Sequence, residues 1–416
     1  MRRALAPVAA LLLGVSILLT GQGLQGTLLP VRATLEGFST VAIGMMGGAY
    51  FFGFTLGCLR GGQLIKRVGH IRVFLAMTAL ASASPLLHGL VLQEWIWALL
   101  RMLTGFCFAV LYVVIESWLN EQSSQENRGV VFATYVMITM TVLAAGQMML
   151  LLYDPAELYL FAIASVLVSL AALPVALSTA PSPEQPEHVK PKLKRLFEIS
   201  PAGTLACLGS GFANGSFWAL APVFTTRLTD DVSLAAWFMT GTVIGGAVSQ
   251  WPLGALSDRV GRRQVMILAS LVAAGIGVAL ALLASQLSNT GVTLLGAAWG
   301  AASFPLYTLA VAHTNDYADP KEYVMVSGGL LLMYGIGAII GPFVASTAME
   351  LAGPAALFMY TAVVHVLLIL YAIFRMLRRK SAPEEQHITF ADALATAGTA
   401  SHVYEEEITQ HAGEER

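Results

Sequence analysis

The stretches GQLIKRVGHIRV (62–73) and GALSDRVGRRQV (254–265) carry one pattern at two places in the chain. In each, a glycine precedes a turn of the form Arg-Val-Gly, and the second copy begins 254 − 62 = 192 positions after the first. Each copy follows an apolar run long enough to cross a bilayer and precedes another such run. The repeat therefore indicates a membrane protein built from two related halves.

The composition is that of a membrane protein. Of the 416 residues, 56% are hydrophobic and 12% are charged, whereas a soluble domain has about a quarter charged residues. Apolar runs of roughly 20 residues recur along most of the chain, and an α-helix of that length crosses the bilayer. We therefore predict an all-α membrane protein, and the spans exclude a soluble enzyme. The net charge of −2 does not favour a nucleic-acid partner, and the three scattered cysteines have no metal-ligand or disulfide spacing.

The apolar runs predict twelve transmembrane helices in two groups of six. The first six are expected at 4–29, 40–63, 72–91, 95–119, 129–152 and 157–179. The other six are expected at 202–225, 233–256, 263–285, 291–314, 322–347 and 354–376. The first run is too long for a signal peptide, so we expect it to remain as a spanning helix. The predicted domains are an N-terminal bundle (1–180), a linker (181–201), a C-terminal bundle (202–377) and a polar tail (378–416).

Lysine and arginine residues set the expected orientation. Almost all of them fall in the termini, the linker and the loops on one side, and the opposite loops hold Arg32 and Arg227. Because cytoplasmic loops carry the excess of positive charge, we expect both termini and the linker in the cytoplasm. The predicted location is the inner (plasma) membrane, where the chain would be a monomer in contact with the lipid bilayer.

The linker and the tail are polar. The sequence PSPEQPEHVKPKLKRLFEIS (181–200) has four prolines, and proline-rich polar sequence favours an extended spacer. Its basic cluster, 190–195, could lie on anionic headgroups. The tail ends in acidic runs, which favour disorder, although a short helix over 390–397 is an alternative.

The repeated loop resembles the signature loop of the major facilitator superfamily, G-x-x-x-D-R-x-G-R-[RK]. The second copy matches fully through Gly254, Asp258, Arg259, Gly261, Arg262 and Arg263. The first copy keeps Gly62, Arg67 and Gly69 but has Lys66 and His70 where the pattern has an acid and an arginine. The resemblance implies two pseudo-symmetric six-helix bundles. The stretch ESWLN (116–120) is similar to that of a bacterial branch of the family with few characterised members.

The loop residues suggest a latch. Cationic side chains at the cytoplasmic interface can pair with acids on a neighbouring helix, and such pairs must break when the cytoplasmic mouth opens. In the first half, Glu116 or Glu121 could pair with Arg67 or Arg72. The alternative is that the loop is a topology signal alone, although Asp258 adds nothing to such a signal.

Polar residues inside spans are candidate binding residues because burying them in lipid is unfavourable. Gln22 and Gln25 lie in the first span, and Asn214 lies in the seventh, where it corresponds to Gln22 across 214 − 22 = 192 positions. The resemblance places helices 1, 4, 7 and 10 around a central cavity, so we predict these residues along the solute path. The alternative is hydrogen bonding between helices through faces of small residues.

Further candidates lie in the fourth and seventh spans. The pattern Arg101-x-x-x-Gly105 resembles a helix-4 motif whose arginine the family links to proton coupling. Arg101 could bind an anionic group or bias a proton site, or it could extend to the interface. Tyr112 and Trp218 would supply aromatic walls, which suit a planar or amphipathic organic solute. Glu116 could carry a proton, or it could belong to the latch.

The sequence has no phosphate-binding loop, nucleophile elbow or metal cluster, so we predict neither an enzyme nor a bound cofactor. The predicted function is secondary active transport of a small organic solute, coupled to protons, by rocking of two bundles around a central site. The alternative is a membrane sensor or scaffold that transports nothing and uses the acidic tail as its partner site.

Overall fold

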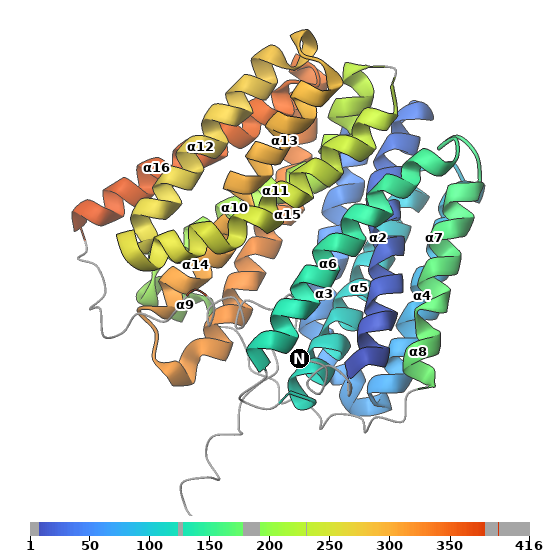
Figure 1. The fold of residues 1–416 in the computed structure, drawn as a ribbon, viewed down its shortest axis with the longest axis horizontal. Helices are drawn as coiled ribbons and strands as arrows, with labels where there is room; N and C mark the ends of the chain where they lie inside the picture. The colour runs from blue at the N-terminus through green and yellow to red at the C-terminus, as the bar shows by residue number, and fades with distance from the viewer. Residues whose placement is uncertain (1–7, 124–127, 178–191, 230, 379–389, 391–416) are drawn as a thin grey trace, which may run out of the picture.

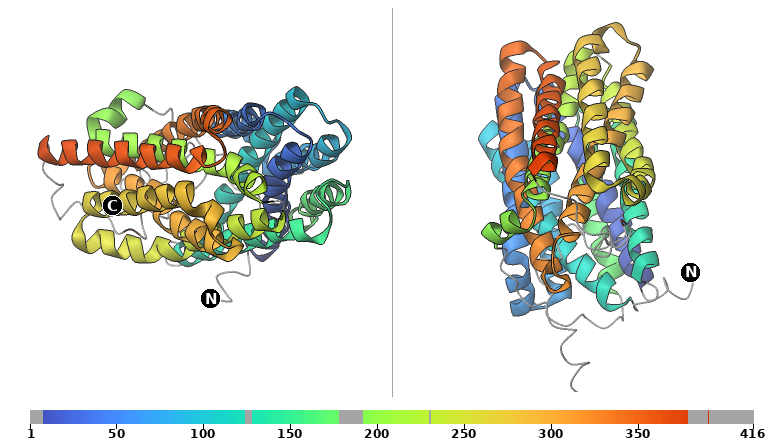
Figure 2. Two further views of the ribbon diagram at one scale, coloured as in Figure 1. Left: turned by 90° about the horizontal axis from the view of Figure 1, so that it is seen from above. Right: turned by 90° about the vertical axis from the view of Figure 1, so that its left-hand side faces the viewer.

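The computed structural model describes residues 8–123, 128–177, 192–229, 231–378 and 390. Within these residues it is all-helical, and the helices run mostly along one direction (Figures 1 and 2). Expectations for the first seven residues, for most of the linker and for nearly all of the tail lie outside the described residues.

Every predicted span of the first half corresponds to a helix. They are α2 (Ala9–Leu35), α3 (Thr40–Val68), α4 (His70–Leu90), α5 (Glu94–Glu121), α6 (Arg128–Met148) with η2 (Met149–Leu152), and α7 (Tyr159–Leu170) with α8 (Ala172–Ala176). The sixth predicted span is divided after Leu170. Pro174 explains the division, because it has no N–H to donate to the carbonyl of Leu170 four residues earlier.

The second half repeats this arrangement. Its helices are α10 (Pro201–Leu228), α11 (Ser233–Val260), α12 (Arg262–Leu283) with η3 (Ala284–Gln286), α13 (Asn289–Ser303) and α14 (Pro305–Asn315), α15 (Tyr323–Ala352) after η4 (Pro320–Glu322), and α16 (Ala356–Arg378). The tenth predicted span is divided at Phe304, where Pro305 begins α14 and cannot continue the hydrogen-bond ladder of α13.

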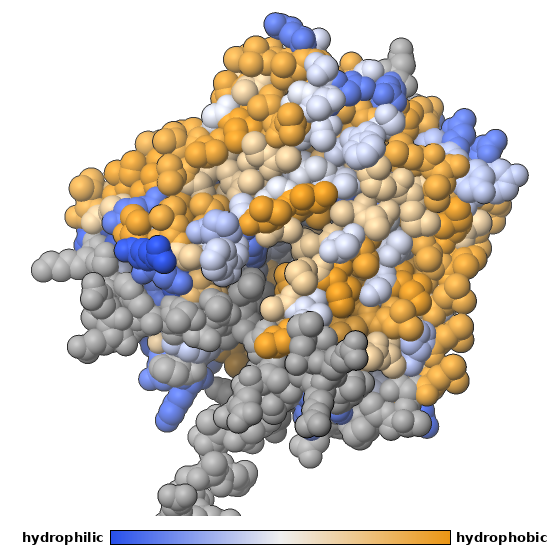
Figure 3. Space-filling model, in the orientation of Figure 1, coloured by the Kyte–Doolittle hydropathy of each residue, from blue (hydrophilic) through white to orange (hydrophobic). Residues whose placement is uncertain are grey.

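Among the described residues, ten helical segments are long and apolar enough to cross a membrane. Helices α10 and α11 have 28 residues each, like the neighbouring spans, but fall outside this group. Asn214 and many glycines lower the hydropathy of α10, and Gln250 with several serines, threonines and glycines lowers that of α11. Apolar side chains cover most of the middle of the surface in Figure 3, with hydrophilic ones toward its ends. This distribution fits a protein whose sides face lipid.

The linker contains a helix that the sequence analysis does not predict. Residues Leu193–Ile199 form α9, which buries Leu196 and Ile199 against the second half. Arg195 donates from Nε to Glu322 at 2.9 Å and from Nη2 at 3.1 Å, and these bonds hold the pKa of the Glu322 carboxyl below its usual range. The expectation of an extended spacer is therefore wrong for this stretch, because its apolar residues pack on α10 and α15.

The two halves lie on opposite sides of the molecule in Figure 1 and meet along a few helices. Helix α3 packs against α15, α6 against α11, and α10 against α2 and α3. Thr240 of α11 donates to the carbonyl of Ala144 in α6 at 3.3 Å, and the Thr40 N–H donates to Glu350 at 3.2 Å. We call the end that carries these contacts the sealed end, and the opposite end, with Gly69 and Gly261, the loop end.

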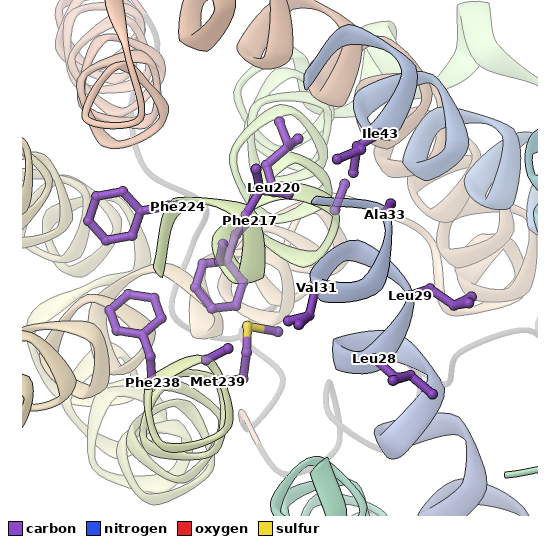
Figure 4. Close-up of a cluster of buried hydrophobic side chains, with 14 of the residues drawn as sticks. Leu28, Leu29, Val31, Ala33, Ile43, Phe217, Leu220, Phe224, Phe238 and Met239 are labelled. Carbon is purple, nitrogen blue, oxygen red and sulfur yellow. The ribbon is translucent and has the colours of Figure 1, made fainter. Parts of the chain in front are cut away.

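A hydrophobic cluster fills the sealed end. In Figure 4, Val31 of α2 lies beside Met239 of α11, and Ile43 of α3 lies beside Leu220 of α10. Burial of such side chains is worth roughly 1.5–3 kcal/mol each, so the cluster is the main apolar contact between the halves at this end. Helices α6 and α11 diverge from it toward the loop end (Figure 1).

The two copies of the repeated loop have one backbone geometry. Gly69 ends α3 and begins α4 with φ +90°, and Gly261 ends α11 and begins α12 with φ +115°. Such a φ with an extended ψ belongs almost exclusively to glycine. The glycine therefore permits the reversal between two helices in each half.

Candidate functional site

A cavity of about 280 Å³ lies between the halves, beside the apolar cluster of the sealed end. Helices α2, α3, α5 and α6 line it from the first half, and α10 and α15 line it from the second. Four of the six predicted cavity residues line it, namely Gln22, Arg101, Tyr112 and Trp218. The structure therefore brings together side chains that are far apart in the sequence.

Gln22 connects two tyrosines of the cavity wall. Its Nε2 donates to the Tyr50 hydroxyl at 2.9 Å, and the Tyr112 hydroxyl donates to its Oε1 at 3.0 Å. The amide thus serves one ring as a donor and the other as an acceptor. The network links α2, α3 and α5 around the cavity.

Arg101 lies over the ring of Tyr50, with its guanidinium carbon 4.2 Å from the ring centroid. It stands seven residues inside α5, or about 10 Å from the start of the helix. Gly53 lies against the backbone of Met102, and Gly105 lies against the backbone of Tyr50. These glycines let α3 and α5 approach closely, which places Tyr50 beneath the arginine.

Aromatic rings form much of the remaining wall. Phe51 and Phe54 come from α3, Trp218 from α10 and Tyr334 from α15. Trp218 is stacked on Phe304, with centroids 5.5 Å apart and planes 17° apart. Phe304 stands at the break between α13 and α14, so the division of that span supplies a support for the wall.

Two predicted cavity residues, Gln25 and Asn214, do not line the cavity. At 100° per residue, the lining positions 22, 23 and 26 of α2 cover one sector of the helix, and Gln25 points about 60° outside it. Gln25 is buried, and its Nε2 has no hydrogen-bond partner among the described residues. Neither residue faces the cavity in this conformation, and their role in solute binding stays a prediction.

Asn214 belongs to a buried polar chain behind the wall. Ser303 donates to Asn214 Oδ1 at 2.8 Å, and Ser303 Oγ lies 3.3 Å from His365 Nε2. Asn214 also lies close enough to the hydroxyl of Tyr334, which does line the cavity, to interact with it. In this conformation Asn214 therefore bonds between helices, as in the alternative that the sequence left open.

Glu116 is completely buried, one helical turn beyond Tyr112 toward the loop end. It lies close enough to Cys58, Tyr112 and Tyr307 to interact with them electrostatically. Tyr307 belongs to the second half, so this acid faces the interface between the halves.

The loop of the second half forms a closed cluster. Arg262 pairs with Asp258 at 2.6 Å and with Asp316, at the end of α14, at 3.4 Å. Arg263 donates to the Tyr317 hydroxyl at 2.8 Å. Both arginines are buried, so these bonds compensate for their desolvation.

The loop of the first half differs from it. Arg67, Arg72 and Glu121 are exposed, and they form no ion pair with the part of the chain that the structure describes. The predicted pairing of Glu116 or Glu121 with Arg67 or Arg72 is therefore not formed in this conformation, since Glu116 is buried while both arginines face outward.

The sequence prediction missed several residues of the wall, two polar ones among them, and one support of the wall. Tyr334 and Gln147 line the cavity, and Ser303 connects Asn214 to His365. A signal existed for Tyr334, because an aromatic residue next to glycines on α15 is typical of a close helix interface. No group of three or more histidine, cysteine or acidic side chains that could hold a metal occurs among the described residues.

An all-α fold with many apolar spans and a cavity between two halves defines a membrane transporter of the secondary active class. The chain belongs to the Major Facilitator Superfamily, whose family model matches residues 11–228 and 203–405. It is therefore a membrane transport protein and not an enzyme.

Two curated relatives are uncharacterized MFS-type transporters. One, from Enterobacter sp. (strain 638), is 29% identical over 346 residues, which cover 83% of this chain and 89% of the relative. The other, YcaD of Escherichia fergusonii, is 28% identical over the same shares of both chains.

Solved structures share the fold. The nucleoside transporter NupG has a TM-score of 0.78 at 14% identity and covers 90% of this chain and 100% of its own. A bacterial homolog of the human lysosomal transporter Spinster, in an inward-facing and occupied conformation, has a TM-score of 0.70 at 16% identity, with 92% and 98% covered. The fucose:proton symporter FucP of E. coli has a TM-score of 0.56 at 16% identity, with 89% and 99% covered.

Proposed function

We propose that the chain moves a small organic solute across the bacterial inner membrane by alternating access, with both termini in the cytoplasm. The moving units are two pseudo-symmetric six-helix bundles, 1–180 and 202–377, so that α10 and α11 cross the membrane with the ten apolar spans. The 192-residue repeat and the matching geometry at Gly69 and Gly261 support this division. The excess of lysine and arginine at the loop end supports its cytoplasmic placement.

The observation that carries the proposal is the cavity lined by both halves. The contacts at the sealed end close the cavity on that side, and its lining extends toward the loop end as far as Leu59 of α3 and Gly328 of α15. This conformation is therefore the cytoplasm-facing one, and because the Arg262 pairs are formed in it, they are not the pairs that break when this mouth opens. Transport requires the sealed end to open and the loop end to close around the same site.

Coupling to protons is the second part of the proposal. Glu116 is a buried acid at the interface between the halves, one turn from a cavity tyrosine. The fucose:proton symporter FucP shares the fold. Glu116→Gln should abolish accumulation driven by a proton gradient while it preserves exchange of solute across the membrane. Loss of both activities, or of neither, would show that Glu116 is not the coupling residue.

Counterflow in proteoliposomes tests the main proposal. Vesicles loaded with an unlabelled solute should take up the labelled solute transiently, for at least one solute of a panel of organic acids, nucleosides and sugars. Vesicles with no protein are the control. A sensor or scaffold on the same fold, with the acidic tail as its partner site, would give no counterflow with any member of the panel.

A further inference from the structure

The guanidinium of Arg101 lies in the cavity and interacts with an aromatic ring. Its guanidinium stacks on Tyr50, and it makes no hydrogen bond or ion pair with any described residue. Among the described residues, it is also the one charged side chain that lines the cavity. Arg101 is partly exposed, toward the cavity. A cation away from bulk water is unfavourable unless an anion or several hydrogen bonds compensate for it, and an anionic group on a solute in the cavity would supply that compensation.

The rest of the cavity suits an apolar, planar body. Phe51, Phe54, Trp218 and Tyr334 supply ring faces and edges, and the Gln22 and Gln147 amides supply a few polar contacts. The volume of about 280 Å³ is at the lower end of ligand cavities, which hold drug-sized compounds from roughly 300 Å³ upward. A single ring with a short substituent matches this size better than a larger solute.

We propose that the transported solute is a small organic anion, with a carboxylate that the Arg101 guanidinium binds and a single planar apolar ring that the aromatic wall contacts. A planar guanidinium presents two parallel N–H donors that match a carboxylate. The proposal rests on the proposed transport function and specifies its substrate class. A neutral nucleoside or sugar would leave Arg101 without a counter-charge.

Matched acid and amide pairs test this proposal. The probes are benzoate against benzamide, phenylacetate against phenylacetamide, and 3-phenylpropionate against its amide. At least one acid should raise the melting temperature of the purified protein where its amide does not. Arg101→Gln should weaken binding of that acid by roughly tenfold or more, because a hydrogen-bonded charged partner is lost. Arg101→Lys should lose part of the affinity, and Arg60→Gln, an exposed arginine of α3 away from the cavity, should lose none.

The result that overturns the anion proposal is distinct from failure of transport. If no acid stabilises the protein more than its amide, or if Arg101→Gln binds the acid as well as the parent, the substrate is not an anion held by Arg101. Counterflow with uridine or fucose would then keep the transport function while this substrate class is abandoned. Absence of counterflow with every probe would overturn the transport function itself.

A separate observation concerns the C-terminal segment. Phe390 is buried in the hydrophobic cluster of the second half at the loop end, together with Val265 and Leu309. Its N–H donates to both oxygens of Asp258, at 3.2 and 3.3 Å, and its ring lies against Gly254. Asp258 is also the partner of Arg262, so one carboxylate joins the C-terminal segment to the signature loop.

From these contacts we infer that Phe390 is a restraint on the transport cycle. The ring occupies space that a side chain at position 254 would fill, and its N–H binds the Asp258 carboxylate beside Arg262. In this conformation, which we take as the cytoplasm-facing one, these contacts keep Asp258 bound within its own half. Their removal should shift the equilibrium toward the conformation in which the sealed end opens.

Labelling of a buried cysteine measures this shift without knowledge of the substrate. Thr40 is fully buried at the sealed end, so a Thr40→Cys protein should react with a maleimide when that end opens. In the Thr40→Cys protein, the second change Phe390→Ala should increase the labelling rate about twofold or more. Phe390→Leu should keep the slow rate, as should Phe374→Ala, which removes an exposed ring of α16. Equal or slower labelling with Phe390→Ala would overturn the inference.

Discussion

Gln22 fixes two tyrosine hydroxyls with a single amide. Its Nε2 donates to Tyr50 and its Oε1 accepts from Tyr112, and each hydroxyl can serve as donor or acceptor. Because Tyr50 carries Arg101 on its ring, the position of the cavity's cation depends indirectly on Gln22.

Gln22→Leu should weaken solute binding by about tenfold, because two hydrogen bonds of roughly 1 kcal/mol each are lost and Tyr50 is released. Gln25→Leu is the matched control on the same helix. Its Nε2 has no partner in the described part of the chain, so an apolar replacement should leave binding unchanged and stability equal or higher. Calorimetric titration and thermal unfolding of both variants check this, and equal loss of binding in the two would contradict the assigned faces of α2.

At the residue scale, the sequence predicts which side chains are candidates but not always which way they face. Gln22 and Gln25 have the same chemistry and lie one helical turn apart. The rotation of α2 is set by contacts such as Gly23 against Leu143 of α6, which is a tertiary fact. Arg101 was foreseeable, since a cation well inside a span has few places to lie except a cavity.

At the element scale, the two signature loops share a turn but differ in their side-chain bonds. The turn is predictable, because Gly69 and Gly261 recur at matching positions of an otherwise basic stretch. The side-chain bonds are harder to predict from the sequence. Arg259 matches the family pattern as well as Arg262, yet Arg259 is exposed and Arg262 is buried. Which arginine faces Asp316 depends on how α12 packs beside α14.

This contrast predicts unequal effects of two neighbouring arginines. Arg262→Gln removes a buried cation from between Asp258 and Asp316, which should lower the free energy of unfolding by on the order of 3 kcal/mol and impair transport. Arg259→Gln removes an exposed charge and should change stability by less than about 0.5 kcal/mol. Thermal unfolding in detergent compares the stability of the two variants, and counterflow rates compare their transport. Similar effects of both changes would mean that the loop acts through its net charge.

At the scale of the whole molecule, the charge distribution predicts the orientation. A reporter fused after Lys380 should read cytoplasmic, and one placed within 226–232 should read periplasmic, because nearly all lysines and arginines lie toward the loop end. Paired reporters that respond on one side of the membrane only, such as alkaline phosphatase and green fluorescent protein, measure this. Both positions on the same side would contradict the twelve-span arrangement.

The sealed end offers a direct test of alternating access. The Thr40 N–H bonds Glu350 of the second half, while the adjacent Ser39 N–H bonds Glu94 of the first half at 3.1 Å. Ser39, Glu94 and Glu350 are all exposed, so two cysteine pairs can be built from one shared position. Cys107 and Cys207 are buried away from the cavity, but Cys58 lines it, so both pairs are built on a Cys58→Ser protein.

Ser39→Cys with Glu350→Cys, joined by a short bifunctional maleimide, links the halves where they must separate. Counterflow should fall to the level of protein-free vesicles, because the sealed end can no longer open, while solute should still bind from the loop end. Ser39→Cys with Glu94→Cys suffers the same loss of the α3 cap and the same reaction, but links residues of one half. It should transport at the rate of its unreacted form. If the link between halves leaves counterflow intact, the contacts at this end do not part during the cycle, and the solute crosses by another route.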